Sequence, residues 1–61
     1  MIRTRYGSEV VIVTNYPNEG KVQLRRIADN KMLECFTTEL RADGGFNEIF
    51  AAIDLVPAIQ T

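Results

Sequence analysis

Hydrophobic and polar side chains largely alternate along residues 21–37, and the alternation is broken once, by the polar pair Asp29-Asn30. Two runs of β-favouring residues on either side of a short polar break are typical of a β-hairpin. Asp and Asn both tolerate the positive φ that a tight type I′ turn requires. The pattern therefore predicts a hairpin whose loop is Asp29 and Asn30, with the rest of the chain arranged around it.

A two-residue loop sets Arg25 directly opposite Glu34, as an opposite-charge pair on one face of the sheet. We expect the other face to meet the core, and it carries Val22, Leu24, Leu33 and Cys35. The face with Arg25 is mixed, because it also carries apolar side chains, namely Ile27, Met32 and Phe36. A three-residue loop would shift the register by one residue and reverse part of this assignment.

The β-branched side chains of residues 9–16 form a continuous run rather than an alternating one. Such a run predicts a central strand that is covered on both faces. Pro17 and Gly20 follow it and mark a turn, because proline fixes φ at the first turn position and glycine accepts a positive φ. This strand is therefore expected to lead directly into the hairpin.

An α-helix is predicted near the end of the chain, where four apolar side chains follow the i, i+3, i+4, i+7 spacing: Phe46, Ile49, Phe50 and Ile53. We expect this face to cover the sheet. Asp43 or Gly45 is the candidate N-cap, and Gly45 would place Glu48 at the N3 position of a capping box. Pro57 ends the helix, and residues 56–61 form either a short last strand or a frayed tail.

These elements predict a single domain over residues 1–61, mainly β, built as a small barrel or a strongly bent antiparallel sheet of about five strands with one C-terminal amphipathic helix. A chain this short buries only about 60% of its unfolded surface. Many domains of this size therefore depend on a disulfide, a metal or a partner subunit. The chain has one cysteine, Cys35, and no histidine. An internal disulfide and a Cys/His metal site are therefore excluded, and efficient packing or self-association remains as the source of stability.

The sequence shows no disulfide framework, no signal-peptide pattern and no apolar run close to the ~18 residues that span a membrane. We therefore expect a cytoplasmic protein without membrane contact. It also lacks a paired acid/base motif and a metal-ligand set, so we expect no enzymatic activity, no cofactor and no metal. Cys35 lies on the predicted core face, where a cysteine acts as a small hydrophobic side chain.

The net charge of −1 hides an asymmetry between the two halves of the chain. Residues 1–33 hold six basic and three acidic side chains, whereas residues 34–61 hold one basic and five acidic ones. The candidate ligand-binding residues are Arg3, Arg5, Tyr16, Lys21, Arg25, Arg26 and Lys31. A basic face of this kind binds phosphates or an acidic protein segment, and an aromatic ring beside it stacks on a base. The alternative is a solvated face balanced by the acidic half.

A glycine-led hydrophobic strand at residues 7–13 is followed by Gly20-Lys21-Val22 and by the hairpin at Asp29-Asn30. In these features, residues 6–37 resemble the SH3-like small-barrel group in its KOW-like or Tudor-like form. The resemblance implies a binding domain, because KOW-like and Tudor-like domains commonly bind nucleic acid or protein segments.

Two functional hypotheses follow. The first is a non-enzymatic binding module that takes nucleic acid or an acidic protein segment on a basic sheet face. The alternative is a homo-oligomeric or subunit-type interaction domain, which the small core and the apolar residues of the mixed hairpin face favour.

Overall fold

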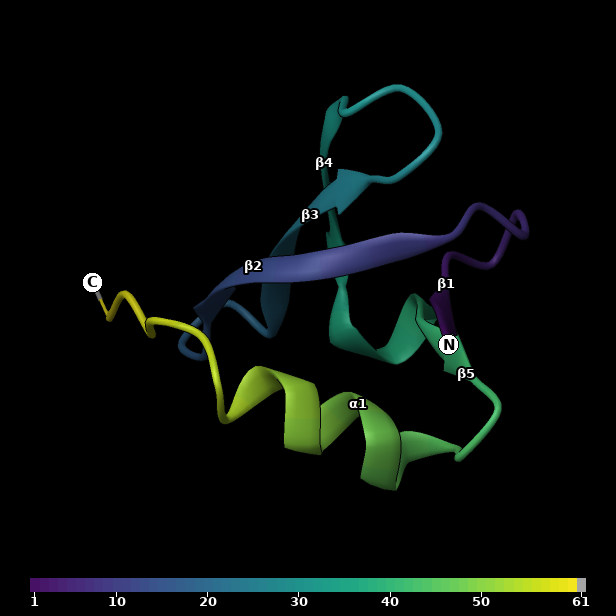
Figure 1. Ribbon diagram of the computed structural model, residues 1–61. Coiled ribbons are helices and arrows are strands. Elements are labelled where there is room, and N and C mark those ends of the chain that lie inside the picture. Colours follow the sequence, from purple (N-terminus) through teal and green to yellow (C-terminus); the bar gives the residue numbers. More distant parts are fainter. Residues whose placement is uncertain (61) are drawn as a thin grey trace.

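The computed structural model describes residues 1–60 and shows a mainly β domain with one C-terminal helix (Figure 1). Its elements in chain order are β1 (Ile2–Arg3), β2 (Val10–Tyr16), β3 (Lys21–Arg26), β4 (Met32–Phe36), the 3₁₀ turn η1 (Thr37–Glu39), β5 (Arg41–Ala42) and α1 (Phe46–Ile53). The strands form two antiparallel sheets, one of order β2-β3-β4 and one that pairs β1 with β5. The predicted fold class is confirmed, and the two sheets are not closed into a barrel.

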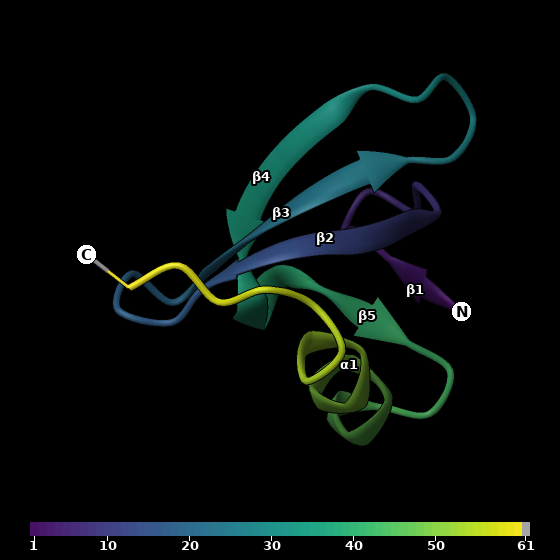
Figure 2. The ribbon, with the colours of Figure 1, turned by 60° about the vertical axis from the view of Figure 1, so that its left-hand side comes forward.

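The three-stranded sheet forms one layer, and the β1–β5 sheet and α1 lie beneath it (Figure 2). The buried core lies between these layers and consists of Ile2, Val10, Ile12, Val22, Leu24, Leu40 and Ile49. Leu40, directly after η1, enters this core although no periodic pattern marks it in the sequence. The outer face of the three-stranded sheet has no element packed on it among residues 1–60.

The central strand of this sheet is β3, so the prediction that residues 9–16 form the central strand is wrong. The continuous apolar run of β2 has another cause. Val10 and Ile12 face the core, whereas Val11 and Val13 are only half-buried. Val13 is an extra residue in the ladder, because Ile12 pairs with Leu24 and Thr14 already pairs with Gln23. Such a bulge bends a strand and increases its twist.

The hairpin between β3 and β4 has a four-residue loop, residues 27–30, rather than the predicted two-residue loop. Arg26 N–H donates to Lys31 O at 2.8 Å, and Leu24 pairs with Leu33. Arg25 therefore lies opposite Met32, and the predicted Arg25–Glu34 pair is wrong. The register differs from the prediction by two residues, and a shift of two preserves the face of every side chain. The predicted core face of the hairpin is accordingly confirmed, with Val22 and Leu24 buried and Leu33 and Cys35 packed against them.

The predicted helix is present, but its buried face differs from the predicted one. Ile49 is buried, and its neighbours on the core side are Ala52, Ile53 and Val56. Phe46 and Phe50 are about half exposed and lie next to each other, with ring centroids 6.0 Å apart. The prediction that the helix face with both rings covers the sheet is therefore wrong for Phe46 and Phe50. The i, i+3, i+4 spacing is shared by two overlapping sets of apolar residues, and the sheet contacts the set that includes Ala52.

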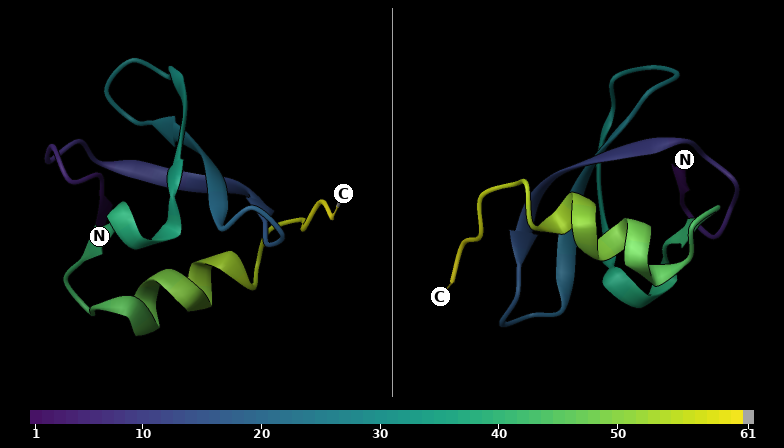
Figure 3. Two further views of the ribbon diagram at one scale, coloured as in Figure 1. Left: turned by 180° about the vertical axis from the view of Figure 1, so that it is seen from behind. Right: turned by 60° about the horizontal axis from the view of Figure 1, so that its bottom comes forward.

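The chain after α1 runs back along the outer edge of β2 (Figure 3). Asn15 N–H donates to Pro57 O at 2.9 Å, and Ile59 N–H donates to Asn15 O at 2.8 Å. Asn15 and Ala58 thus form a parallel bridge, which covers part of the edge that β2 presents. Within residues 1–60, none of the helical structure is long and apolar enough to cross a membrane.

Candidate binding cleft

The seven residues predicted to bind a ligand do not form one basic patch. Tyr16, Lys21 and Arg25 point to the outer face of the three-stranded sheet, and Lys31 lies at the end of the hairpin loop. The remaining cations lie elsewhere: Arg5 and Arg26 line a cleft between the β1–β2 loop and the three-stranded sheet, and Arg3 lies on β1. The structure therefore brings together two small groups and separates them from Arg3 and Lys31.

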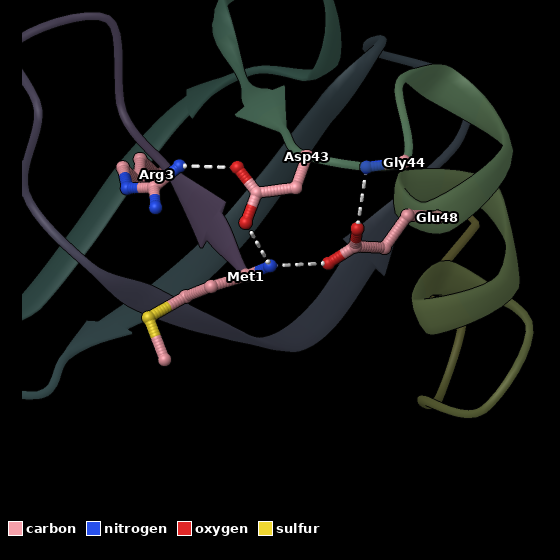
Figure 4. A network of polar contacts seen from close by, with 5 residues as sticks. All are labelled: Met1, Arg3, Asp43, Gly44 and Glu48. Carbon is pink, nitrogen blue, oxygen red and sulfur yellow. Dashed lines mark hydrogen bonds and ion pairs between the residues drawn. The ribbon is translucent and has the colours of Figure 1, made fainter.

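Arg3 is part of a polar network that joins β1 to the start of α1 (Figure 4). Its Nη1 lies 3.0 Å from Asp43 Oδ1, and the amino group of Met1 lies 3.3 Å from Asp43 Oδ2 and 2.9 Å from Glu48 Oε2. Gly44 N–H donates to Glu48 Oε1 at 2.8 Å. These hydrogen bonds hold the pKa of Asp43 and of Glu48 below their ordinary values. Arg3 therefore has a structural role in this network.

The N-terminus of α1 is organised by the same carboxylate. Gly45 is the N-cap, as one of the two predicted alternatives had it, with φ 70° and ψ −158°. Glu48 accepts its backbone hydrogen bond from Gly44 rather than from the N-cap residue, so the predicted capping box is displaced by one position.

Three more cations are paired with acids of the same chain. Arg26 contacts Asp29 Oδ1 and Oδ2 at 3.0 and 2.7 Å, Arg5 lies 3.4 Å from Glu39, and Lys21 lies 3.7 Å from Glu34. Arg25 instead donates to the Asn30 side-chain oxygen at 2.8 Å. The positive charge of the strand region is thus largely neutralised locally, which the linear sequence does not show.

A cleft of about 550 Å³ opens between the β1–β2 loop and the three-stranded sheet. Its walls come from the β1–β2 loop, from β3 and β4, and from η1. The lining residues are Thr4, Arg5, Tyr6, Ser8, Leu24, Arg26, Leu33, Glu34, Cys35 and Glu39. The volume is within the range of ordinary ligand pockets, about 300–1,000 Å³. Apolar side chains from the hairpin meet charged side chains of both signs here, so the cleft has no strong net charge.

The β1–β2 loop is a compact turn that is held by hydrogen bonds within residues 4–8. Thr4 N–H donates to Ser8 O and Gly7 N–H donates to Thr4 O, both at 2.9 Å, and the Thr4 hydroxyl oxygen accepts further bonds from Tyr6 and Ser8 N–H. Gly7 has φ 89°, a value that glycine adopts without strain. The loop therefore presents Arg5 and Tyr6 from a fixed backbone. Arg5 Nη2 donates to the Tyr6 hydroxyl at 2.6 Å, and the guanidinium carbon of Arg5 lies 4.9 Å from the centroid of the Tyr6 ring.

Strand β4 is the free edge of its sheet, and this edge borders the cleft. The hydrogen bonds Arg26 N–H to Lys31 O and Thr37 N–H to Gly20 O fix the phase of the β3–β4 ladder. In an antiparallel ladder, hydrogen-bonded pairs alternate with non-bonded ones. Leu33 and Cys35 therefore bond to β3, whereas the backbone N–H and C=O groups of Met32 and Glu34 point away from it.

The end of this edge is closed by η1, because Phe36 N–H donates to Glu39 Oε2 at 3.2 Å. The neighbouring Cys35 lines the cleft and keeps a neutral thiol. Burial raises its pKa above the ordinary value, and the nearby carboxylates Glu39 and Glu34 raise it further. Nothing in this arrangement activates the thiol as a nucleophile.

The outer face of the sheet is the second candidate surface. The register places Tyr16, Lys21 and Phe36 in one row across β2, β3 and β4. Lys21 Nζ lies 5.3 Å from the centroid of the Phe36 ring. Of the residues predicted for ligand binding, this row brings together Tyr16 and Lys21, and it adds Phe36, which the sequence indicates only as an apolar member of a mixed face.

Comparisons with known proteins give no relative: no family model matches the chain, and neither the curated proteins nor the solved structures contain a significant match. The function of the protein is therefore inferred from the geometry of the cleft and of the outer sheet face.

Proposed function

We propose that the protein is a non-enzymatic binding module that takes a short extended segment of another protein in the cleft between its β1–β2 loop and its three-stranded sheet. The observation that supports this most is the combination of an open cleft of about 550 Å³ with a free strand edge along its side. A sheet edge of this kind offers main-chain hydrogen bonds to an extended segment, and the pockets beside it select side chains.

We further propose that the chain belongs to the SH3-like small-barrel group. The strand order supports this, because the first strand pairs with the last and the three strands between them form a meander. Domains of this group commonly bind protein segments or nucleic acid, which agrees with a binding function. The open seam between the sheets is then the place where this chain departs from a closed barrel.

The ligand preference expected from the sequence, an acidic segment on a basic face, has weaker support than the cleft itself. Arg5 and Arg26 line the cleft, but each already contacts an acid of the same chain, Glu39 and Asp29. An acidic ligand would have to compete with these carboxylates. An extended segment would instead be bound by main-chain hydrogen bonds to the β4 edge and by apolar contacts with Leu24, Leu33 and Cys35.

The test is selection of short peptides from a random displayed library on the immobilised protein, followed by measurement of the affinity of one enriched peptide in solution. Tyr6, on the rim of the cleft, and Leu55, outside it, are both strongly exposed, so neither substitution is expected to unfold the protein. We expect Tyr6→Ala to weaken binding and Leu55→Ala to leave it unchanged. Equal binding by both variants, together with backbone amide shifts confined to other surfaces, would contradict a site in the cleft.

A second candidate function is binding of single-stranded nucleic acid on the outer sheet face, and the row Tyr16–Lys21–Phe36 favours it. Bases stack on aromatic side chains, and a nearby cation contacts the phosphates. Fluorescence anisotropy with short single-stranded DNA and RNA, at low and at moderate salt, tests this candidate. Affinity that falls steeply with salt and is lost in Lys21→Glu would support it, and no binding at low salt would remove it.

A further inference from the structure

We infer that the bound segment adds to β4 as a fourth strand of the sheet, with apolar residues directed into the cleft on either side of one basic residue that lies opposite Glu34. The inference rests on the proposed function, because it specifies how a segment in the cleft would be recognised.

The backbone contacts come from Met32 and Glu34. Their N–H and C=O groups point away from β3, and no other strand lies beside β4 within residues 1–60. A residue placed directly opposite Glu34 in an antiparallel strand would accept from its N–H and donate to its C=O. Exposed edges with unpaired groups are templates for pairing with another chain. Phe36 N–H is already bonded to Glu39, so the available edge is short and ends at η1.

The side-chain pattern follows from the alternation of the pleat. Leu33 and Cys35 point toward the cleft, where both pack against the core without being fully buried. Residues of an added strand that lie opposite these two would point to the same side and would bury apolar surface against them. Leu24 lines the cleft beneath them and completes the apolar floor. Two apolar residues separated by one position therefore fit the cleft side of the strand.

The charge of the partner follows from Glu34, whose side chain lies on the outer face of the sheet. The side chain of Glu34 is 57% exposed, and its ion pair with Lys21 is long, at 3.7 Å. Lys21 lies on β3, so the opposite flank of the carboxylate is open to a strand added at β4. A basic residue there forms an opposite-charge cross-strand pair. Met32 and Phe36 flank Glu34 with 48% and 51% of their surface exposed, and they can cover the aliphatic stem of a Lys or Arg.

A second copy of the chain fits this edge less well than a single segment. The middle residue of β4 is Glu34, and symmetric pairing of two β4 strands centred on it would set two carboxylates opposite each other. The edge also lies inside a cleft whose other wall is the loop of residues 4–8. A single extended chain is narrower than a folded domain, so it meets both walls.

The probe is a fluorescein-labelled, end-capped peptide of sequence Thr-Val-Lys-Val-Thr, whose lysine is designed to lie opposite Glu34. Two matched peptides serve as controls: one carries Glu in place of Lys, and the other carries a methyl group on the lysine backbone nitrogen. We expect the methylated peptide to bind at least about tenfold more weakly, because it loses a main-chain hydrogen bond and clashes with the edge. We expect the Glu peptide to bind at least about fivefold more weakly than the Lys peptide.

The variant Glu34→Lys provides the reciprocal control, since Glu34 is exposed and the substitution leaves the core intact. It should prefer the Glu peptide over the Lys peptide. In the natural protein, hydrogen exchange of the Met32 and Glu34 amides should slow when the Lys peptide binds, whereas exchange at Gln23, on the central strand, should not change.

Several results would overturn the inference. If methylated and unmethylated peptides bind equally in the cleft, strand addition is wrong while the proposed function stands. If the Lys and Glu peptides bind alike, the assigned charge is wrong. If none of these three peptides binds, although peptides selected from the library do bind in the cleft, both the side-chain pattern and the addition of a strand to β4 are wrong. A dimer in sedimentation that slows exchange at Met32 and Glu34 without any peptide would assign the edge to a second copy.

Discussion

Arg26 donates two hydrogen bonds to the Asp29 carboxylate across the loop of the hairpin, Nε to Oδ1 at 3.0 Å and Nη2 to Oδ2 at 2.7 Å. The same carboxylate accepts the backbone N–H of Lys31 at 3.2 Å. Both ends of the four-residue loop are thus joined through one side chain. Asn30 completes the turn with φ 58°, a conformation that asparagine tolerates better than most residues.

The first prediction concerns the pKa of Asp29, which these contacts lower to about 2. The hydrogen bonds from Arg26 are the main cause, so we expect Arg26→Gln to raise this pKa toward its ordinary value of 3.8. A pKa that is lower in the folded state stabilises the fold above the unfolded pKa, and this contribution disappears as the pH falls through the folded value. The loop should therefore lose this support between about pH 4 and pH 2.

Carboxyl carbon shifts followed by NMR during an acid titration measure this pKa. Arg25→Gln is the matched control, because Arg25 is adjacent in sequence but bonds to Asn30 instead. Its titration curve for Asp29 should coincide with that of the unmodified protein. An Asp29 pKa that does not move in Arg26→Gln would show that the two-point contact is absent in solution.

The same contact explains why the register of the hairpin was not predictable. Asp29-Asn30 marks the turn correctly, but turn residues alone do not state whether two or four residues lie between the last paired positions. The actual loop depends on Arg26 reaching Asp29, a side-chain contact that has no periodic signature. The face of each strand was predictable because a shift of two residues leaves the pleat alternation unchanged.

The second prediction separates two apolar residues of α1. Ile49 is 1% exposed, whereas Phe50 is 53% exposed. We expect Ile49→Ala to cost about 2–5 kcal/mol of unfolding free energy, as for other buried side chains truncated to alanine. Phe50→Ala should cost less than about 1 kcal/mol, although Phe is the larger residue. Urea denaturation followed by circular dichroism measures both, and a larger cost for Phe50 would contradict the orientation of the helix.

The helix illustrates a limit of periodicity. The sequence contains apolar residues at 46, 49, 50 and 53 and also at 49, 52, 53 and 56, and both sets follow helical spacing. By size, phenylalanine is favoured over alanine as a core residue. Tertiary packing decides which set is buried: Ala52 packs against the core, and the Phe46–Phe50 pair remains outside it. The presence of the helix can therefore be predicted from the local sequence, whereas the face that it buries depends on its tertiary contacts.

The third prediction concerns Gly45, the N-cap of α1. Its φ of 70° and ψ of −158° lie in a region that is essentially restricted to glycine. Gly45→Ala should therefore destabilise the protein by about 1–3 kcal/mol through the backbone alone. A Cβ at this position would meet no atom within 4 Å, so steric contact with neighbours does not contribute. Thermal unfolding measures the effect, with Ala51→Gly as a comparison at an exposed helical position. An unchanged melting temperature in Gly45→Ala would be inconsistent with this cap geometry.

The candidate site was predictable only in part. The sequence identified the cations, and two of them, Arg5 and Arg26, do line the cleft. It did not reveal that Glu39 neutralises Arg5, because these two residues are far apart in the sequence. The cleft itself is formed by residues that are far apart in the chain, from the β1–β2 loop, β3, β4 and η1, and their meeting has no signature in the sequence. The alternation at Leu33 and Cys35 was the available signal, since it identified side chains that point to the inner face.

The last prediction concerns the reactivity of Cys35, the one thiol in the chain. Burial and the carboxylates of Glu39 and Glu34 raise its pKa above the ordinary value of 9.0, so at neutral pH nearly all of it is the unreactive thiol. Reaction with a neutral aromatic disulfide should be slower than reaction of free cysteine, and its rate should still be rising at pH 9. In Glu39→Gln the pKa should fall, because a carboxylate that opposes the thiolate is removed. Glu9→Gln, which alters a carboxylate that is not among the causes of the shift, should leave the rate unchanged. A fast reaction at neutral pH would mean that Cys35 is neither partly buried nor held beside these acids, and the described geometry of the cleft would then be wrong.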